Sequence, residues 1–390
     1  MTIAGSSRKV QVVTIFGTRP EAIKMAPVVR RLSQCDHLSS RVLVTAQHRE
    51  MLDQVLSHFQ ITPDYDLNLM KAGQTLTELT SRVLVGVSRV LSSHRPDLVL
   101  VHGDTTTTFA AALAAFYQQI PVGHVEAGLR TGEKYSPFPE ELNRRLTGSL
   151  ADWHFAPTRR AADNLLAESI REDRIIITGN TAIDALQETV SPHYRFADPH
   201  LEEILNRVPK TIVVEVHRRE NWGEPMRQII TAVRDLARKY RSEVGILFSV
   251  HRNPVVADPV RQLLADEPNI QLFDPLDYPD WANLMARSYL ILTDSGGIQE
   301  EAPSLGVPVV LLRTTTERPE AVEAGTVLRV DPVYDRIVQE VGRLIEDPAS
   351  HRRMARAANP FGDGRASERI VQTILYHFGY RLDKPQPLHV

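Results

Sequence analysis

Three carboxylates and one imidazole occupy positions in the sequence that suit proton transfer. Asp104 and Glu126 each follow an apolar run of strand length. Glu140 ends the loop Tyr135–Glu140, and His217 follows another apolar run in the second half of the chain. Proton transfer at carbon needs a base and an acid whose pKa values are separated by burial and neighbours. A group of carboxylates also suits the positive charge that develops on a reacting sugar ring.

Two of these acids, Asp104 and Glu126, also have a local structural interpretation. Asp104 precedes the run Thr105–Thr108 and would suit the cap of a helix that begins there. Glu126 lies four residues before Arg130, with which it would form a salt bridge. The local role is plausible for any single residue, whereas the set as a whole favours catalysis.

A second group of residues would suit an anion. The segment Asp294–Glu301 follows an apolar run and opens a predicted helix. Ser295 is a typical cap for that helix, and Gly296 and Gly297 let a ligand approach its free N–H groups. The helix dipole adds partial positive charge, so a diphosphate would bind there. A plain serine cap with a glycine turn is the alternative.

Four further charged residues are candidates for contacts with the same ligand. Glu301 would accept hydrogen bonds from ribose hydroxyls, and Arg318 would contact the anion unless it forms a surface salt bridge. Arg19 follows the turn Phe16–Gly17 and would point at the diphosphate. Lys24 lies further along the same predicted helix, where exposure to solvent is equally compatible with the sequence.

Several motifs that would indicate other chemistry are missing from the sequence. It contains no GxGxxG fingerprint for a nicotinamide cofactor and no GxxxxGK[ST] loop for a nucleoside triphosphate. No histidine or acidic pair has the compact spacing of a zinc or two-metal site, and there is no GxSxG elbow. We therefore expect neither a metal nor another cofactor.

Short apolar runs that alternate with helical patterns would position these residues. Runs of this kind predict parallel strands buried on both faces, and two sets in series predict two Rossmann-like domains. The expected strands of the first half are Val10–Phe16, Arg41–Val44, Leu98–Val101, Val122–Val125, His154–Phe155 and Ile175–Thr178. Those of the second half are Thr211–Val216, Gly245–Val250, Ile270–Phe273, Leu290–Thr293, Val309–Leu312 and Val327–Val330.

Polar loops follow these strands, and ligands of open α/β sheets bind at that edge. We therefore predict an α/β fold with two domains that face a central cleft. The predicted N-terminal domain spans 1–185 and the predicted C-terminal domain, which carries the anion site, spans 186–365. A C-terminal helix within 366–390 is expected to pack back on the first domain.

Composition excludes several classes of protein. A chain of 390 residues with 42% hydrophobic and 24% charged residues is typical of globular proteins with more than one domain. A formal net charge of -3 argues against a nucleic-acid partner. The single Cys35 excludes an intrachain disulfide, and no apolar stretch has the length of a signal peptide or membrane span. We expect a cytoplasmic protein without a membrane partner.

Seven motifs together resemble the bacterial non-hydrolysing UDP-N-acetylglucosamine 2-epimerases, from Val13 to about Gly364. They are FGTRPEAIKMAP at Phe16–Pro27, TAQHREMLDQVL at Thr45–Leu56, VHGDTTTT at Val101–Thr108, GHVEAGLRTG at Gly123–Gly132, HRREN at His217–Asn221, LTDSGGIQEEAPSLG at Leu292–Gly306 and TERPEAVEAGT at Thr316–Thr326.

The resemblance implies a glycosyltransferase-B type fold with its active site between the two domains. It implies reversible conversion of UDP-N-acetylglucosamine to UDP-N-acetylmannosamine without NAD or metal, which would supply cell-envelope polysaccharide precursors. The C2 proton is removed, UDP leaves by anti elimination, and UDP adds back to bound 2-acetamidoglucal. A homodimer is expected.

The resemblance also assigns roles to residues. The implied catalytic residues are Asp104, Glu126, Glu140 and His217. The implied contacts of the UDP-sugar are Arg19, Lys24, Leu276, Trp281, Ser295, Gly296, Gly297, Glu301 and Arg318. Trp281 stands where these enzymes usually place phenylalanine near the uracil, and Leu276 would contact the base through its backbone. In several bacterial relatives a second UDP-N-acetylglucosamine activates the enzyme, and Gln47, Arg218 and His251 match the positions used there.

Three positions depart from the family pattern. Glu215 replaces a threonine close to His217, where it would shift the pKa or orientation of that histidine. Thr314 replaces an acidic residue and Arg252 a leucine. These changes bear on sugar preference and kinetics. The alternative functions are a UDP-sugar-dependent glycosyltransferase of the same fold, an epimerase for a modified UDP-sugar, and a UDP-sugar-binding regulator without catalysis.

Overall fold

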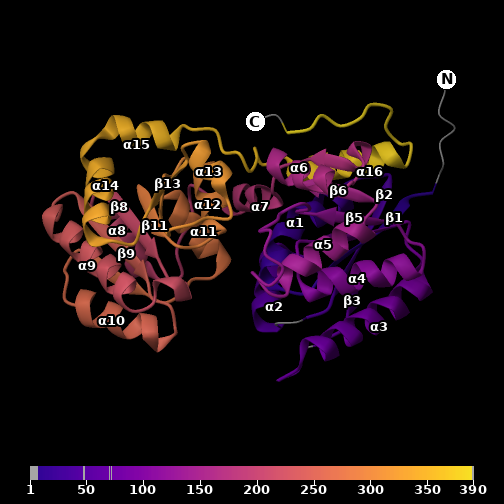
Figure 1. Cartoon of the computed structure of the whole chain (residues 1–390), viewed down its shortest axis with the longest axis horizontal. Helices are drawn as coiled ribbons and strands as arrows, with labels where there is room; N and C mark the ends of the chain where they lie inside the picture. Colours follow the sequence, from indigo (N-terminus) through magenta and orange to yellow (C-terminus); the bar gives the residue numbers. More distant parts are fainter. Residues whose placement is uncertain (1–7, 47–48, 70, 72, 389–390) are drawn as a thin grey trace. The chain divides into compact units, whose positions relative to one another are not determined.

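The structure is a computed structural model that describes residues 8–46, 49–69, 71 and 73–388. It divides into two compact units (Figure 1). The first unit comprises the described residues up to Glu188 and those from Phe361 onward, and the second comprises Thr189–Pro360. Each unit is an α/β structure built on one parallel sheet.

The first unit is built on a seven-stranded sheet with the order β3-β2-β1-β4-β5-β6-β7. Its strands are β1 (Val10–Phe16), β2 (Leu38–Val44), β3 (Tyr65–Asp66), β4 (Leu98–His102), β5 (Val122–Val125), β6 (Trp153–Ala156) and β7 (Ile175–Ile177). Its helices are α1 (Arg19–Ser33), α2 (Arg49–His58), α3 (Leu76–His94), α4 (Thr106–Tyr117), α5 (Glu140–Leu150), α6 (Arg159–Ala167), α7 (Thr181–Thr189) and α16 (Ala366–His377). Buried side chains of β1, β4, α3 and α4 form a core on this sheet.

The second unit is built on a six-stranded sheet with the order β10-β9-β8-β11-β12-β13. Its strands are β8 (Lys210–Glu215), β9 (Val244–Ser249), β10 (Ile270–Phe273), β11 (Leu290–Thr293), β12 (Val309–Leu312) and β13 (Val327–Val330). Its helices are α8 (Pro199–Arg207), α9 (Glu224–Lys239), α10 (Pro254–Leu264), α11 (Tyr278–Ala286), α12 (Ile298–Glu301), α13 (Pro319–Glu323), α14 (Tyr334–Glu346) and α15 (Pro348–Ala355). The core packs α9, α10 and α14 on the sheet.

Each sheet reverses its strand order at one place. In the first unit the chain moves outward from β1 to β3, and β4 then returns to the other side of β1. In the second unit β11 returns to the other side of β8 in the same way. Loops that leave such a switch point diverge and open a crevice at the carboxyl ends of the strands. The candidate site residues after β1, β4, β8 and β11 lie at these two positions.

The predicted fold class of two parallel α/β domains is confirmed, and the differences are local. Strand β3 was missed because two residues carry no periodic pattern. The predicted C-terminal helix ends at His377, and Leu388 in the following segment donates a backbone hydrogen bond to Ile177.

The unit boundaries differ from the predicted 185/186 and 365/366. The segment from Phe361 belongs to the first unit because its buried ring and its carbonyl, which accepts from the Asn180 N–H at 2.6 Å, anchor it there. Helix α16, drawn in yellow in Figure 1, packs on α1 of this unit. Among the described residues, no helix is both long and apolar enough to cross a membrane.

Three buried histidines lie on three neighbouring strands of the first sheet. Burial lowers the pKa of His102 on β4 to about 4, that of His124 on β5 to about 3 and that of His154 on β6 to about 4. The folded state therefore keeps these side chains neutral, whereas the unfolded chain protonates them near pH 6.5. Their stabilising contribution is complete above pH 6.5 and is lost as the pH falls through about 4.

We therefore expect the free energy of unfolding to fall as the pH is lowered from 7 to 4. A shift as large as that of His102 corresponds to on the order of 3 kcal/mol. Urea unfolding at several pH values measures this slope. The variant His124→Gln keeps a donor for the Gly103 carbonyl, which accepts from His124 Nε2 at 2.7 Å, and should flatten the slope. An unchanged slope in this variant would contradict the assignment.

Candidate active site

Asp104 follows β4 and is held by residues of α5. Arg144 Nη2 lies 2.5 Å from Asp104 Oδ2, and Asn143 Nδ2 donates to the Asp104 carbonyl at 3.0 Å. Burial raises the pKa of Asp104 above its ordinary value; Arg144 opposes this shift, while Glu126 and Glu140 reinforce it. A raised pKa brings a carboxyl group closer to the range that suits general acid–base catalysis.

The capping role considered for Asp104 is not observed. The N-cap of α4 is Thr105, whose hydroxyl oxygen accepts from the Thr108 N–H at 3.1 Å. The Asp104 side chain pairs with Arg144 at the carboxyl end of β4 instead of capping α4.

Glu126 is strained and well enclosed. It follows β5 with a φ of 62°, a left-handed conformation that non-glycine residues rarely adopt and that often marks functional sites. Its side chain is 10% exposed and contacts Lys24 Nζ. Asn180 Nδ2 donates to Glu126 Oε2 at 2.9 Å, and His102 Nε2 lies 3.8 Å from the same oxygen. Both charged and neutral donors therefore converge on this carboxylate.

The local interpretations of Glu126 and Lys24 are both wrong. Arg130 pairs with Glu168 at 2.6 Å instead of with Glu126. Lys24 is only 17% exposed and points at Glu126 instead of into solvent. The structure thus brings Lys24 and Glu126 together from α1 and β5.

Glu140 and Arg19 lie at the starts of helices in the same unit. Glu140 is the first residue of α5, half-buried, and close enough to Asp104 to raise its pKa. Arg19 is the first residue of α1, directly after β1, and is half-buried. Within the described part of the chain the Arg19 side chain forms no hydrogen bond or ion pair, so its guanidinium group can receive an anion.

Glu21 is a buried residue of this region that we did not predict. Its Oε2 accepts from the backbone N–H groups of Gly17 and Thr18, and its Oε1 accepts from the Thr105 and Thr108 hydroxyls at 2.7 and 3.0 Å. It therefore ties the start of α1 to the start of α4. The pattern Thr-x-x-Glu at Thr18–Glu21 is that of a capping box and was the available signal.

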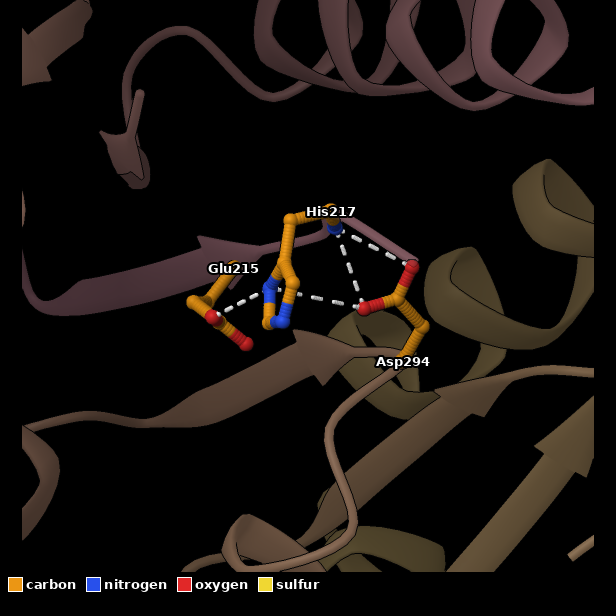
Figure 2. Close-up of side chains that lie close together, drawn as sticks. All are labelled: Glu215, His217 and Asp294. Atoms are coloured by element: carbon orange, nitrogen blue, oxygen red, sulfur yellow. Dashed lines mark hydrogen bonds and ion pairs between the residues drawn. The ribbon is translucent and has the colours of Figure 1, made fainter. Parts of the chain in front are cut away.

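His217 is the centre of a polar cluster at the switch point of the second sheet (Figure 2). Its Nδ1 lies 2.7 Å from Glu215 Oε1 at the end of β8. Its backbone N–H donates to Asp294, which follows β11, with both carboxylate oxygens at 3.1 Å. The Arg218 N–H and Asn221 Nδ2 also donate to Asp294, each at 2.9 Å. Asp294, which we did not single out as a site residue, therefore shapes the loop that carries His217.

The hydrogen bonds of this cluster bear on whether it binds a metal. Glu215, His217 and Asp294 each bring one nitrogen or oxygen atom within 4.8 Å of the others, a spacing that three metal ligands also have. Both oxygens of Asp294 already accept N–H hydrogen bonds, and His217 Nδ1–H donates a hydrogen bond to Glu215. We interpret the cluster as a hydrogen-bonded imidazole site.

The loop Asp294–Gly297 after β11, which we call the glycine loop, differs from the prediction in one respect. Ser295 does not cap α12: the N-cap is Gly297, no side chain caps the helix, and the Ser295 N–H donates to Thr293 Oγ1 at 2.9 Å. The local reason is that α12 starts two residues later than a Ser295 cap requires. Glu301 ends α12, and its Oε1 lies 3.9 Å from the place where a Cβ on Gly297 would be.

Arg318 forms salt bridges, yet it lies against the glycine loop. It pairs with Glu300, and its Nη1 lies 2.8 Å from Glu317 Oε1. A Cβ atom added to Gly296 would lie 2.6 Å from Arg318 Nη1. The Arg318 guanidinium group therefore packs on the loop at Gly296.

Leu276 and Trp281 lie near the carboxyl ends of β9 and β10. Leu276 lines a pocket of about 570 Å³ together with Val250, Phe273 and Asp277. Trp281 is half-buried in the first turn of α11. A pocket at the carboxyl ends of the strands of a parallel sheet is a suitable place for a flat base.

Of the three residues expected at a regulatory site, two are described. Gln47 lies outside the described residues. Arg218 pairs with Glu317 at 3.5 Å, and the His251 ring stacks on the His217 ring at 5.3 Å between centroids. Both of these residues belong to the surroundings of His217.

Two parallel α/β units with polar loops at their switch points define the class: an α/β protein of the glycosyltransferase-B type. The family described as UDP-N-acetylglucosamine 2-epimerase matches residues 30–375. A Bacillus subtilis (strain 168) protein named UDP-N-acetylglucosamine 2-epimerase is 54% identical over 378 residues, which are 97% of this chain and 98% of that protein. The protein of that name from Escherichia coli (strain K12) is 52% identical, with 93% of this chain and 98% of that protein covered.

A solved structure supports the same assignment. The crystal structure of UDP-GlcNAc 2-epimerase from Neisseria meningitidis bound to UDP-GlcNAc is 51% identical, with a TM-score of 0.82, and covers 94% of this chain and 100% of that one. The chain therefore belongs to the UDP-N-acetylglucosamine 2-epimerase family.

Proposed function

We propose that the protein converts UDP-N-acetylglucosamine reversibly to UDP-N-acetylmannosamine by inversion at C2. The observation that carries this proposal is the identity of about half of all residues with UDP-N-acetylglucosamine 2-epimerases over nearly the whole chain. The buried carboxyl group of Asp104, with its raised pKa, supports a reaction that exchanges a proton.

The reaction proposed is an elimination followed by an addition. A base removes the C2 proton while the bond from C1 to the UDP oxygen breaks, which leaves a C1–C2 double bond in bound 2-acetamidoglucal. A proton then returns to C2 on the opposite face, and the UDP oxygen bonds to C1 again. The sugar is neither oxidised nor reduced overall, so the scheme needs no redox cofactor.

Each candidate residue has a place in this scheme. We assign Asp104, Glu126, Glu140 and His217 to proton transfer and leaving-group departure, because these groups can donate, accept or stabilise charge. We assign the nucleotide-sugar contacts to Arg19, Lys24, Leu276, Trp281, Ser295, Gly296, Gly297, Glu301 and Arg318. Lys24 would in addition neutralise Glu126, with which it pairs.

The experiment that tests the function is incubation of the purified protein with UDP-N-acetylglucosamine in D2O, without any acceptor and with EDTA present. NMR is expected to show deuterium entering C2 and UDP-N-acetylmannosamine accumulating. Exchange that requires a sugar acceptor would favour a glycosyltransferase, and release of free N-acetylmannosamine would indicate a hydrolysing enzyme. Loss of activity with EDTA that Mg²⁺ restores would contradict a metal-independent reaction.

Gly296→Ala is expected to weaken binding of the UDP-sugar. The new Cβ atom would displace the Arg318 guanidinium group, the flexible end of a long side chain, so the fold should tolerate it. Loss of one hydrogen bond to a charged group costs about 1.5–3 kcal/mol, or about a 10–100-fold rise in KM with little change in kcat. Gly148→Ala is the matched control, because its Cβ would lie 3.5 Å from the nearest atom, Arg130 Nη2. An unchanged KM in Gly296→Ala would remove Arg318 from the anion site.

We also propose that a second UDP-N-acetylglucosamine activates the enzyme through Gln47, Arg218 and His251. Coupling of about 1–3 kcal/mol between two sites is ordinary and would appear as a sigmoidal forward rate curve. The reverse reaction from pure UDP-N-acetylmannosamine would then start slowly and accelerate as UDP-N-acetylglucosamine accumulates. A hyperbolic forward curve together with a reverse reaction without a lag would contradict the activation.

We further propose that the enzyme acts in the cytoplasm as a homodimer and supplies precursors of cell-envelope polysaccharides. The exposed aromatic rings of Phe116 and Tyr117 at the end of α4 are compatible with contact to a second copy. Light scattering of the purified protein tests the dimer.

A further inference from the structure

Glu215 is placed to control the protonation of His217. It is the last residue of β8, and its Oε1 lies 2.7 Å from His217 Nδ1. Its other oxygen accepts from the Thr293 hydroxyl at 3.0 Å, so the neighbouring strand β11 prevents the carboxylate from turning away. An ionised carboxylate only accepts hydrogen bonds, so the proton of this bond belongs to Nδ1. Figure 2 shows the carboxylate and the imidazole facing each other.

The rest of the surroundings holds the imidazole in that orientation. The backbone N–H of His217 is bound by Asp294, whose side chain is fully buried. The ring also stacks on His251 with an angle of 11° between the planes. The Asn253 N–H donates to His251 Nδ1 at 3.1 Å, so a neutral His251 carries its proton on Nε2 and does not compete for the Glu215 carboxylate.

The groups around His217 together raise its pKa above the ordinary value of a histidine. The hydrogen bond to Glu215 raises the pKa of His217; burial lowers it, and the charges of Glu215 and Asp294 add to the rise. Arg218 is the cation that opposes them. Carboxylates thus outweigh the cation and the burial, and the imidazolium form persists to a higher pH than in an isolated histidine.

We propose that Glu215 is a positioning residue for His217: it keeps a proton on Nδ1 and makes Nε2 the nitrogen that exchanges a proton with the substrate. This inference rests on the proposed function, since it gives His217 a defined part in the epimerisation. Carboxylates that hold the far nitrogen of a catalytic histidine fix its tautomer in the same way. Replacing such a carboxylate by an amide supplies an N–H donor or a weaker acceptor in its place, which permits the wrong tautomer.

The test is a pair of measurements on Glu215→Gln. In the protein without substrate and with EDTA present, NMR of the imidazole nitrogens reports both the tautomer and the pKa of His217. We expect the variant to lose the fixed Nδ1–H form and its pKa to fall towards the ordinary value near 6.5. With substrate, we expect kcat to drop about 10²-fold or more with a much smaller change in KM, and the limb of the pH–rate profile that reports His217 to move to lower pH.

The control is Glu220→Gln. Glu220 lies on the same loop as His217, and its carboxylate pairs with Arg313 at 2.6 Å. It should leave both the His217 titration and the pH–rate profile as in the wild type. If Glu215→Gln fails to fold, Glu215→Asp keeps the charge at a greater distance and should shift the His217 titration in the same direction by less.

The outcomes separate this inference from the proposed function. An unchanged His217 tautomer and pKa in Glu215→Gln would overturn the inference, whatever the activity. An altered titration with an unchanged kcat and pH–rate profile would also overturn it, because Nε2 would then have no part in the reaction. If the wild-type protein has no epimerase activity, the proposed function fails, whereas the titration still decides whether Glu215 controls the protonation of His217.

Discussion

Replacement of Asp104 by asparagine is expected to lower kcat by about 10²–10⁴-fold, the range typical of losing a positioned acid or base. The amide has the size of the carboxyl group but does not exchange a proton in this way. Arg144 keeps a second carboxylate, Glu141, at 3.6 Å, so the loop after β4 should retain its place. The measurement is steady-state turnover of UDP-N-acetylglucosamine, together with deuterium exchange at C2.

The matched control for Asp104→Asn is Asp173→Asn. Asp173 is also paired with an arginine, Arg171 at 2.7 Å, but on the exposed surface of the same unit. An exposed pair contributes little to stability, so this variant should behave like the wild type. Near-normal turnover in a folded Asp104→Asn protein would show that the proton is transferred elsewhere, and Glu126→Gln would then be the next variant to measure.

Glu21→Ala is expected to produce the largest loss of stability. The buried carboxylate accepts backbone N–H bonds from Gly17 and Thr18 at 3.0 and 2.8 Å, and alanine leaves both donors without a partner. Each buried unsatisfied donor costs about 1–3 kcal/mol, so the free energy of unfolding should fall by about 2–6 kcal/mol. Urea unfolding at pH 7 measures this loss, and kcat should fall as well because Asp104 precedes the Thr105 that Glu21 binds.

Two further variants serve as comparisons for the loss of stability in Glu21→Ala. Glu133→Ala removes an exposed carboxylate of the same unit and should change stability by less than about 0.5 kcal/mol. Glu21→Gln keeps one acceptor oxygen and should fall between the wild type and Glu21→Ala. Equal stability of Glu21→Ala and Glu133→Ala would mean that water replaces the carboxylate as the acceptor.

The amino-acid sequence alone determined the fold class and the position of most candidate residues along the chain. A strand buried on both faces must be apolar at every position, and such runs are readable without any knowledge of their neighbours. The end of an apolar run marks the end of a strand, so the polar residues that follow, such as Asp104, Glu126 and His217, were predicted at strand ends. The boundaries of β2 and the two residues of β3 were not predicted, because the sheet hydrogen bonds extend beyond the apolar runs.

Only the tertiary structure decided which partners these residues have. Spacing suggested that Asp104 caps a helix and that Glu126 pairs with Arg130. Asp104 instead pairs with Arg144, 40 residues away, and Glu126 accepts from Asn180, 54 residues away. The physical reason is that Arg144 on α5 and Asn180 after β7 reach these carboxylates only in the assembled sheet, and strand order leaves no trace in an apolar run. His217 therefore meets Asp294 because β8 lies beside β11, a neighbourhood that the sheet creates across 77 residues of chain.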